Sequence, residues 1–178
     1  QSNGEKSLHT AREMLANDTE GNIKMVMAPQ NETGAGVTTN PKKLRDLLDE
    51  LKHPALLVID GISSIASMPC SMTEMGIDML VGCSQKGMMG TPGIGMITLS
   101  PKAVQKIRES AQQMEEAGVK KGQHYLNLSK MIEAMETNGL HIETPGNYAQ
   151  FAVALDSLAI EGIERVCERH KDCSEIFR

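Results

Sequence analysis

The sequence has 178 residues, 40% of them hydrophobic, which suits one globular domain with a substantial core. Its formal net charge of −5 is spread along the chain without a basic stripe, which argues against a nucleic-acid partner. No apolar run approaches the roughly 18 residues of a membrane span and no secretory signal is visible, so we expect no membrane partner.

The aromatic residues and cysteines indicate what kind of core the protein has and which compartment suits it. Two Tyr, two Phe and no Trp stand against 13 Met, so the core should be aliphatic and methionine-filled. Cys70, Cys83, Cys167 and Cys173 show no C-x-x-C spacing. We therefore expect reduced thiols in an intracellular compartment rather than a metal site or a disulfide framework. The cytoplasm is the first choice, with a peroxisome or mitochondrion left open.

Strands and helices alternate in the first part of the chain. Leucines at positions 44, 47, 48 and 51 follow Pro41 at helical spacing, between two short apolar runs. This order predicts a right-handed βαβ unit with parallel strands, preceded by one helix. The expected helices cover residues 7–17 and 41–51, the expected strands cover residues 23–28 and 55–60, and residues 30–40 are expected to form a polar loop.

A hairpin is predicted next. A strand at residues 78–81 runs into Ser84-Gln85-Lys86, a glycine-rich loop follows, and residues 94–99 form a second strand. About eleven residues join the two strands, too few for a parallel crossover, so the strands should pair antiparallel. The remaining helices are expected over residues 101–114, 127–137, 148–158 and 163–177, with an irregular stretch at 62–74 and an extended segment at 141–146.

Two charged residues follow the ends of predicted strands. Asp60 closes a strand that reads as buried on both faces, and in open α/β folds ligands bind at this carboxyl edge. Lys86 follows the next strand, a place that suits a Schiff-base lysine, whose amine must act as a nucleophile. Taken singly, Asp60 also reads as a turn former and Lys86 as a solvated surface residue.

The order of these motifs resembles that of fold-type I pyridoxal-phosphate enzymes. The similarity is greatest to the class V alanine–glyoxylate, serine–glyoxylate and serine–pyruvate aminotransferases, and it runs from about Ile23 to the C-terminal end. The motifs that carry it are Asn31-Glu32-Thr33-Gly34-Ala35-Gly36-Val37, His53-Pro54-Ala55-Leu56-Leu57-Val58-Ile59-Asp60, Gly76-Ile77-Asp78, Ser84-Gln85-Lys86 and Gly90-Thr91-Pro92-Gly93. The resemblance implies the large domain of that fold in part: a mostly parallel sheet with one antiparallel strand and helices on both faces.

The resemblance also implies roles for single residues. Lys86 matches the lysine that forms the Schiff base with pyridoxal 5'-phosphate and carries a proton during transamination. Asp60 matches the aspartate beside the pyridine nitrogen, where an ionised carboxylate keeps that nitrogen protonated. Gln85 matches a phosphate contact, Thr33 a hydroxyl near the phenolic oxygen, and Ile62 an apolar side chain against the ring. Without the motif these three read as a solvated amide, a loop threonine and a core isoleucine.

A second group of implied contacts comes from residues 141–145. In the family this segment reaches across a dimer interface to the phosphate of the neighbouring subunit, so a homodimer is expected. Thr144 matches the family threonine, whereas His141 stands where many relatives carry tyrosine and also reads as a loop histidine. The resemblance assigns residues 1–140 to the cofactor-binding large domain, and residues 141–178 to an interface segment with helices that lead toward a further, C-terminal domain.

The implied reaction is transamination between serine or alanine and a 2-oxo acid, either glyoxylate or pyruvate. Two alternatives stay open at this point. Another enzyme of the fold, such as a cysteine desulfurase, usually has His before the lysine, where this chain has Gln85. A non-catalytic domain that kept the scaffold would also fit, because the family's Ser/Gly-rich phosphate loop, ring-stacking aromatic residue and carboxylate-binding arginine are not among these residues.

Overall fold

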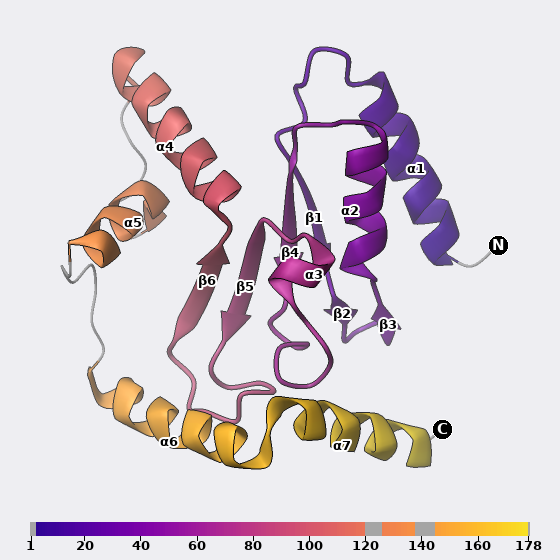
Figure 1. The fold of residues 1–178 in the computed structure, drawn as a ribbon, viewed down its shortest axis with the longest axis vertical. Coiled ribbons are helices and arrows are strands. Elements are labelled where there is room, and N and C mark those ends of the chain that lie inside the picture. The colour runs from indigo at the N-terminus through magenta and orange to yellow at the C-terminus, as the bar shows by residue number, and fades with distance from the viewer. Residues whose placement is uncertain (1–2, 120–125, 138–144, 178) are drawn as a thin grey trace.

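A computed structural model of the chain describes residues 3–119, 126–137 and 145–177. Strands and helices are interspersed as far as Leu99, and the elements described after it are all helices (Figure 1). The elements are α1 (Asn3–Asn17), β1 (Met25–Pro29), β2 (Asn31–Glu32), β3 (Val37–Thr38), α2 (Pro41–Glu50), β4 (Leu56–Asp60), α3 (Met72–Met75), β5 (Met79–Cys83), β6 (Gly95–Leu99), α4 (Pro101–Glu116), α5 (Leu128–Glu136), α6 (Pro145–Glu161) and α7 (Ile163–Ile176).

The main sheet has four strands in the order β1-β4-β5-β6. β1, β4 and β5 are parallel, and β6 runs antiparallel to β5, with Cys83 opposite Gly95 at the end of the pair. The expected fold class, including the antiparallel hairpin, is therefore confirmed. The short hairpin connection had decided that direction, because it left no room for a crossover helix.

The alternating side chains of β4 form two cores on opposite faces of the sheet. Leu57 and Ile59 are fully buried against the leucines of α2 and against Leu15 of α1. On the other face, Leu56 and Val58 are buried together with Ala103 at the start of α4. Helices thus cover both faces, α1 and α2 on one side and α4 on the other, as Figure 1 shows.

The last two helices, α6 and α7, run along the edge of the sheet at which β1, β4 and β5 end (Figure 1). Leu158 of α6 and Val166 of α7 are buried against Ala66, with Ile65 and Met88 packed around them. Because Ala66 and Met88 belong to the loops that follow β4 and β5, these helices support both loops from outside the sheet.

Four features differ from the sequence-based expectation. Helix α6 begins at Pro145, inside the stretch 141–146 that was expected to be extended. Residues 30–40 contain a two-stranded antiparallel hairpin, β2–β3, rather than only a loop. The stretch 62–74 contains the short helix α3, which starts at the N-cap Ser71 and ends at Gly76 in the left-handed conformation. Strand β5 runs on to Cys83, two residues beyond its expected end. Among the described helices, none is long and apolar enough to span a membrane.

Asp18 closes the connection between α1 and β1, and we expect it to make stability depend on pH. Its carboxylate accepts the Ile23 N–H at 2.6 Å and the Asn22 N–H at 2.8 Å, and lies 3.2 Å from His53 Nε2. The Ile23 hydrogen bond, with smaller contributions from Asn22 and His53, lowers the pKa of the Asp18 carboxyl below its ordinary value of 3.8. The carboxylate therefore stabilises the fold above that value, and the stabilisation is lost as pH falls through the folded pKa.

Asp18→Asn should accordingly lower the melting temperature by several degrees at pH 7, and the difference from the parent should shrink below about pH 4. Thermal melts followed by circular dichroism at pH 7, 5 and 3.5 test this. A difference that stays the same at all three pH values would show that the charge of Asp18 is not what stabilises the turn.

Candidate active site

The carboxyl ends of the three parallel strands meet at one edge of the sheet and place Asp60 and Lys86 there. Asp60 is the last residue of β4 and pairs with Pro29 of β1 on one side and Val81 of β5 on the other. Lys86 lies in the loop that follows β5, the neighbouring strand. In an open α/β sheet this edge is where ligands bind.

Both charged side chains are exposed. Asp60 Oδ1 accepts the Ile62 N–H at 2.8 Å, which closes a turn and fixes the carboxylate beside the strand end. Within the described part of the chain, neither the second Asp60 oxygen nor the Lys86 amine has a hydrogen bond or ion pair. One anionic and one cationic group on adjacent strand ends are therefore free to bind a ligand.

Ser84 shapes the loop that carries Lys86. It is fully buried and uses three groups: its N–H donates to Ile94 O at 3.1 Å, its Oγ donates to Thr91 O at 2.6 Å, and its carbonyl accepts the Gly90 N–H at 2.7 Å. A further turn is closed by the Met89 N–H, which donates to Lys86 O at 2.8 Å. The loop is thus ordered by its own backbone, and Lys86 stands on a rigid turn.

The loop after Asp60 lies against the end of β5. A Cβ at Gly82 would lie 2.6 Å from Ile65 Cδ1, so the absence of a side chain at position 82 leaves room for the Ile65 side chain as it stands. The Cys83 thiol donates a weak hydrogen bond to Ile62 O, with 3.9 Å between sulfur and oxygen. Asp60, Ile62 and Lys86 therefore belong to one packed unit.

Thr33 comes to the same edge through the β2–β3 hairpin. Asn31 Nδ2 donates to Ser63 Oγ at 3.0 Å, and Ser63 Oγ donates to Asn31 O at 2.9 Å. The Gln30 N–H donates to Asp60 O at 2.9 Å. These bonds tie the hairpin to the loop after β4, and they leave Thr33 exposed in its turn.

The remaining predicted site residues divide into two groups. Gln85 is exposed in the Lys86 loop, and Ile62 is 36% exposed beside Asp60, so the edge also offers an amide and an apolar side chain. His141 and Thr144 lie outside the described residues. Sequence reasoning thus brought five residues to one edge: Thr33, Asp60, Ile62, Gln85 and Lys86.

Two of the four cysteines, Cys70 and Cys167, are held as protonated thiols. All four are free thiols. Burial is the main cause that raises the pKa of both Cys70, in the loop after β4, and Cys167, on α7. A thiol with a raised pKa stays protonated at neutral pH, so Cys70 and Cys167 are poor nucleophiles.

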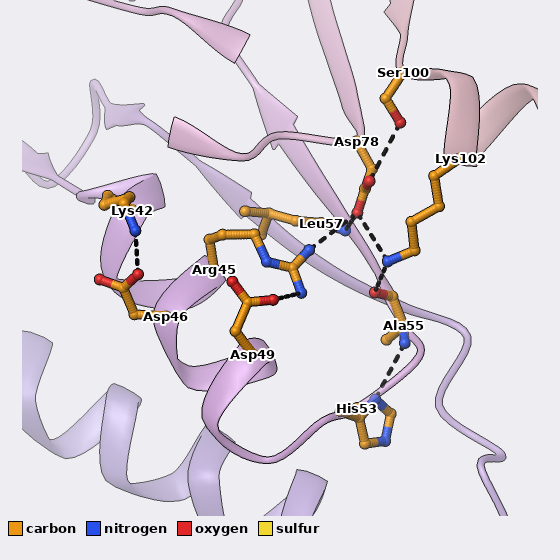
Figure 2. A network of polar contacts seen from close by, with 10 residues as sticks. All are labelled: Lys42, Arg45, Asp46, Asp49, His53, Ala55, Leu57, Asp78, Ser100 and Lys102. Atoms are coloured by element: carbon orange, nitrogen blue, oxygen red, sulfur yellow. Dashed lines mark hydrogen bonds and ion pairs between the residues drawn. The ribbon is translucent and has the colours of Figure 1, made fainter. Parts of the chain in front are cut away.

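At the opposite edge of the sheet the structure shows a polar cluster that the sequence did not reveal (Figure 2). The buried carboxylate of Asp78 accepts the Leu57 N–H at 2.9 Å and lies 3.3 Å from Arg45 Nη1 and 3.5 Å from Lys102 Nζ. Its other oxygen accepts the Ser100 hydroxyl at 3.2 Å. Asp78 therefore joins α2, β4, β5 and the start of α4, and its role is structural.

Comparison with known proteins fits this geometry. The family described as Aminotransferase class-V matches residues 1–164. The chain belongs to this family. Among relatives of this class V aminotransferase chain, the L-aspartate–glyoxylate aminotransferase of Paracoccus denitrificans is 34% identical over 159 residues, and the serine–glyoxylate aminotransferase of Hyphomicrobium methylovorum is 34% identical over 160. Each match covers 89% of this chain and 38% of the relative, so the chain spans well under half the length of both.

Solved structures show the same fold for this class V aminotransferase chain. An alanine–glyoxylate aminotransferase from Nostoc sp. superposes with a TM-score of 0.79 at 24% identity, over 96% of this chain and 42% of that one. A pyridoxamine–pyruvate aminotransferase from Mesorhizobium loti gives 0.73 at 21% identity, over 92% and 39%. At these identities the likeness concerns the fold alone.

Class V membership implies pyridoxal phosphate as the cofactor, and the groups at the carboxyl edge fit it. An unpaired carboxylate suits a pyridinium nitrogen, a primary amine suits an aldehyde, and hydroxyl and amide donors suit the phenolic and phosphate oxygens. The apolar Ile62 adds a surface on which an aromatic ring can pack. The groups at this edge thus fit a part of what this cofactor needs.

Proposed function

We propose that the protein carrying this chain is an aminotransferase that moves an amino group from serine or alanine to glyoxylate or pyruvate with pyridoxal phosphate. The observation that carries the proposal is the placement of Asp60 and Lys86 at the carboxyl ends of two adjacent parallel strands. Both relatives described above have glyoxylate in their names, so glyoxylate is the acceptor to test first.

Each residue of the edge would have a physical task. Bound pyridoxal phosphate supplies an electron sink for the pair left behind when the substrate α-carbon loses its proton. The Lys86 amine would hold the cofactor covalently at rest. Once released by the amino substrate, it would take the proton from the substrate α-carbon and deliver it to C4′ of the cofactor. The Asp60 carboxylate would hold the proton on the pyridine nitrogen through a charge-assisted hydrogen bond.

The other predicted contacts would place the cofactor. Gln85 would donate to the phosphate, Thr33 to the phenolic oxygen, and Ile62 would pack on one face of the ring. We propose further that Thr144 and His141 contact the phosphate in a neighbouring subunit, which makes the working enzyme a homodimer. Residues 1–140 would then belong to the cofactor-binding large domain, and residues 141–178 to an interface segment with the helices that follow it.

The test is covalent capture on the full-length protein that carries this chain. Pyridoxal phosphate is added, the absorbance of a C=N bond to lysine is recorded, the bond is reduced with borohydride, and the modified peptide is identified by mass spectrometry. We expect the pyridoxyl group on Lys86, and amino transfer to glyoxylate from serine, alanine or aspartate. Binding without a modified lysine would support a non-catalytic protein, and modification of another lysine would refute the site.

Asp60→Asn should separate the role of the carboxylate from that of the amine. The covalent bond to Lys86 should still form, because the amine is unchanged, while turnover falls by about 10²–10³-fold, as for other positioned electrostatic groups. Turnover and the absorbance spectrum are recorded side by side with the parent protein. Turnover at the parent rate would reduce Asp60 to a turn former at the end of a buried strand.

A further inference from the structure

Gly87 follows Lys86 directly and lies against the loop that follows Asp60. A Cβ at position 87 would lie 2.3 Å from the Ile65 carbonyl oxygen, 2.3 Å from Ser67 Oγ and 3.1 Å from the Ala66 carbonyl carbon. Gly87 is not among the residues with positive φ, so its backbone conformation does not call for glycine. The position needs a glycine for space alone.

The loop on the other side of this contact is held in place and has little freedom to retreat. The N–H groups of Ser64 and Ile65 donate to Gly61 O at 3.1 and 2.9 Å, and those of Ser67 and Met68 donate to Ser64 O at 2.9 Å each. These bonds close consecutive hydrogen-bonded turns over residues 61–68.

Packing from outside adds to this restraint. Ala66 is buried against Leu158 of α6 and Val166 of α7. Since Ser84 and Met89 order the Lys86 loop in the same way, two rigid backbones meet at Gly87.

We propose that Gly87 is a positioning residue that sets where the Lys86 amine stands relative to the Asp60 carboxylate. Its missing side chain lets the backbone next to Lys86 rest directly on the turns that follow Asp60, so the two charged groups are held by one contact. The inference rests on the proposed function of Lys86 and Asp60, and it adds a residue that itself touches neither cofactor nor substrate.

The size of the effect follows from the overlap. Real Cβ atoms essentially never come within 3.0 Å of such neighbours, so a methyl group at 2.3 Å from a backbone oxygen requires a shift approaching one ångström. A misplacement of about 1 Å is enough to cost about 10²-fold in rate when it falls on a reacting group. Gly87→Ala should therefore slow the chemistry of Lys86 by about that factor.

The experiment compares Gly87→Ala with Gly95→Ala in the full-length protein. Gly95, in β6 beyond the same loop, has open space around its Cβ position and no positive φ, so it controls for an added methyl group. Three quantities are measured: the melting temperature, the affinity for pyridoxine 5'-phosphate, and the rate of capture on Lys86. Pyridoxine 5'-phosphate has no aldehyde and reports noncovalent binding alone.

In the capture step the amine adds to the aldehyde carbon of pyridoxal phosphate and water leaves, which gives the C=N bond. Borohydride then delivers hydride to that carbon, and the nitrogen takes up a proton. The rate of this step depends on where the Lys86 amine lies relative to the aldehyde carbon. A substitution that only lowers the melting temperature would leave this rate unchanged.

We expect Gly87→Ala to bind pyridoxine 5'-phosphate nearly as well as the parent, but to form the Lys86 bond and turn over about 10²-fold more slowly. Gly95→Ala should match the parent. Equal capture rates in Gly87→Ala and Gly95→Ala would overturn the positioning role. No capture on Lys86 in the parent itself would instead refute the proposed function.

A second variant serves if Gly87→Ala does not accumulate as folded protein. Gly87→Ala combined with Ser67→Ala removes the overlap with the hydroxyl and keeps the overlap with the Ile65 carbonyl oxygen. We expect the double variant, like Gly87→Ala, to keep noncovalent binding and to capture the cofactor slowly. Ser67→Ala alone is its control. A double variant that captures the cofactor at the rate of Ser67→Ala would overturn the inference.

Discussion

Lys86→Ala should abolish covalent capture of pyridoxal phosphate and lower transamination by at least about 10²–10⁴-fold, the contribution typical of a positioned acid–base group. Both proposed tasks of Lys86 belong to one amine, and within the described residues no other lysine follows a parallel strand at this edge. Noncovalent binding should persist, because the other predicted contacts remain. The measurements are borohydride capture with peptide mass analysis, and single-turnover rates.

The matched control is Lys43→Ala, which removes an exposed lysine on α2 and should leave both measurements unchanged. Addition of a small alkylamine gives a second check, since a free base can replace part of the missing proton transfer. Partial recovery with the amine would identify Lys86 as a proton carrier. Full activity in Lys86→Ala without any amine would remove this residue from the mechanism.

Asp78→Ala should lower the free energy of unfolding by about 3 kcal/mol, the low end of the cost of breaking a buried ion pair, because Arg45 keeps its ion pair with the exposed Asp49. Arg45 is only 12% exposed and packs over Asp78, which is 8% exposed, so water cannot easily replace the carboxylate (Figure 2). The Leu57 N–H would also lose its acceptor. Urea denaturation at pH 7, with the midpoint and slope fitted for parent and variant, measures the loss.

Figure 2 also shows the control for this prediction, the ion pair between Lys42 and Asp46 on the surface of α2. Its side chains are 50% and 59% exposed, and exposed pairs at this helical spacing contribute only about 0.3–0.5 kcal/mol. Asp46→Ala should therefore have a small effect. Equal losses in Asp46→Ala and Asp78→Ala would show that burial does not distinguish the two aspartates.

Local pattern and chain length predicted the parts of the fold that position Asp60 and Lys86. The stripe of leucines on one face of α2 predicts that this face packs against the sheet, and in the structure these leucines are part of the core. The short link between β5 and β6 fixed their direction for a geometrical reason. Asp60 could be placed at the carboxyl edge because a buried apolar run ends there.

The parts that escaped prediction depend on contacts between distant segments. The strands β2 and β3 have two residues each and little apolar pattern, and their hairpin is tied through Asn31 to Ser63 in the loop after β4. Asp78 was noted only as part of a motif, since nothing near it in sequence reveals that Arg45 would cover it. The space that Gly87 requires likewise depends on Ile65, which belongs to another loop.

The antiparallel pairing of β5 with β6 also affects the entropy lost when the sheet forms. The last rung of this hairpin joins Cys83 to Gly95, whereas every rung between β1 and β4 joins residues as far apart as Met25 and Leu56. Closure entropy grows with the logarithm of the intervening length, so the hairpin rung closes at roughly 0.8 kcal/mol less cost. Lys86 therefore lies in the connection between β5 and β6, the pair of neighbouring strands in this four-stranded sheet whose pairing costs the least closure entropy.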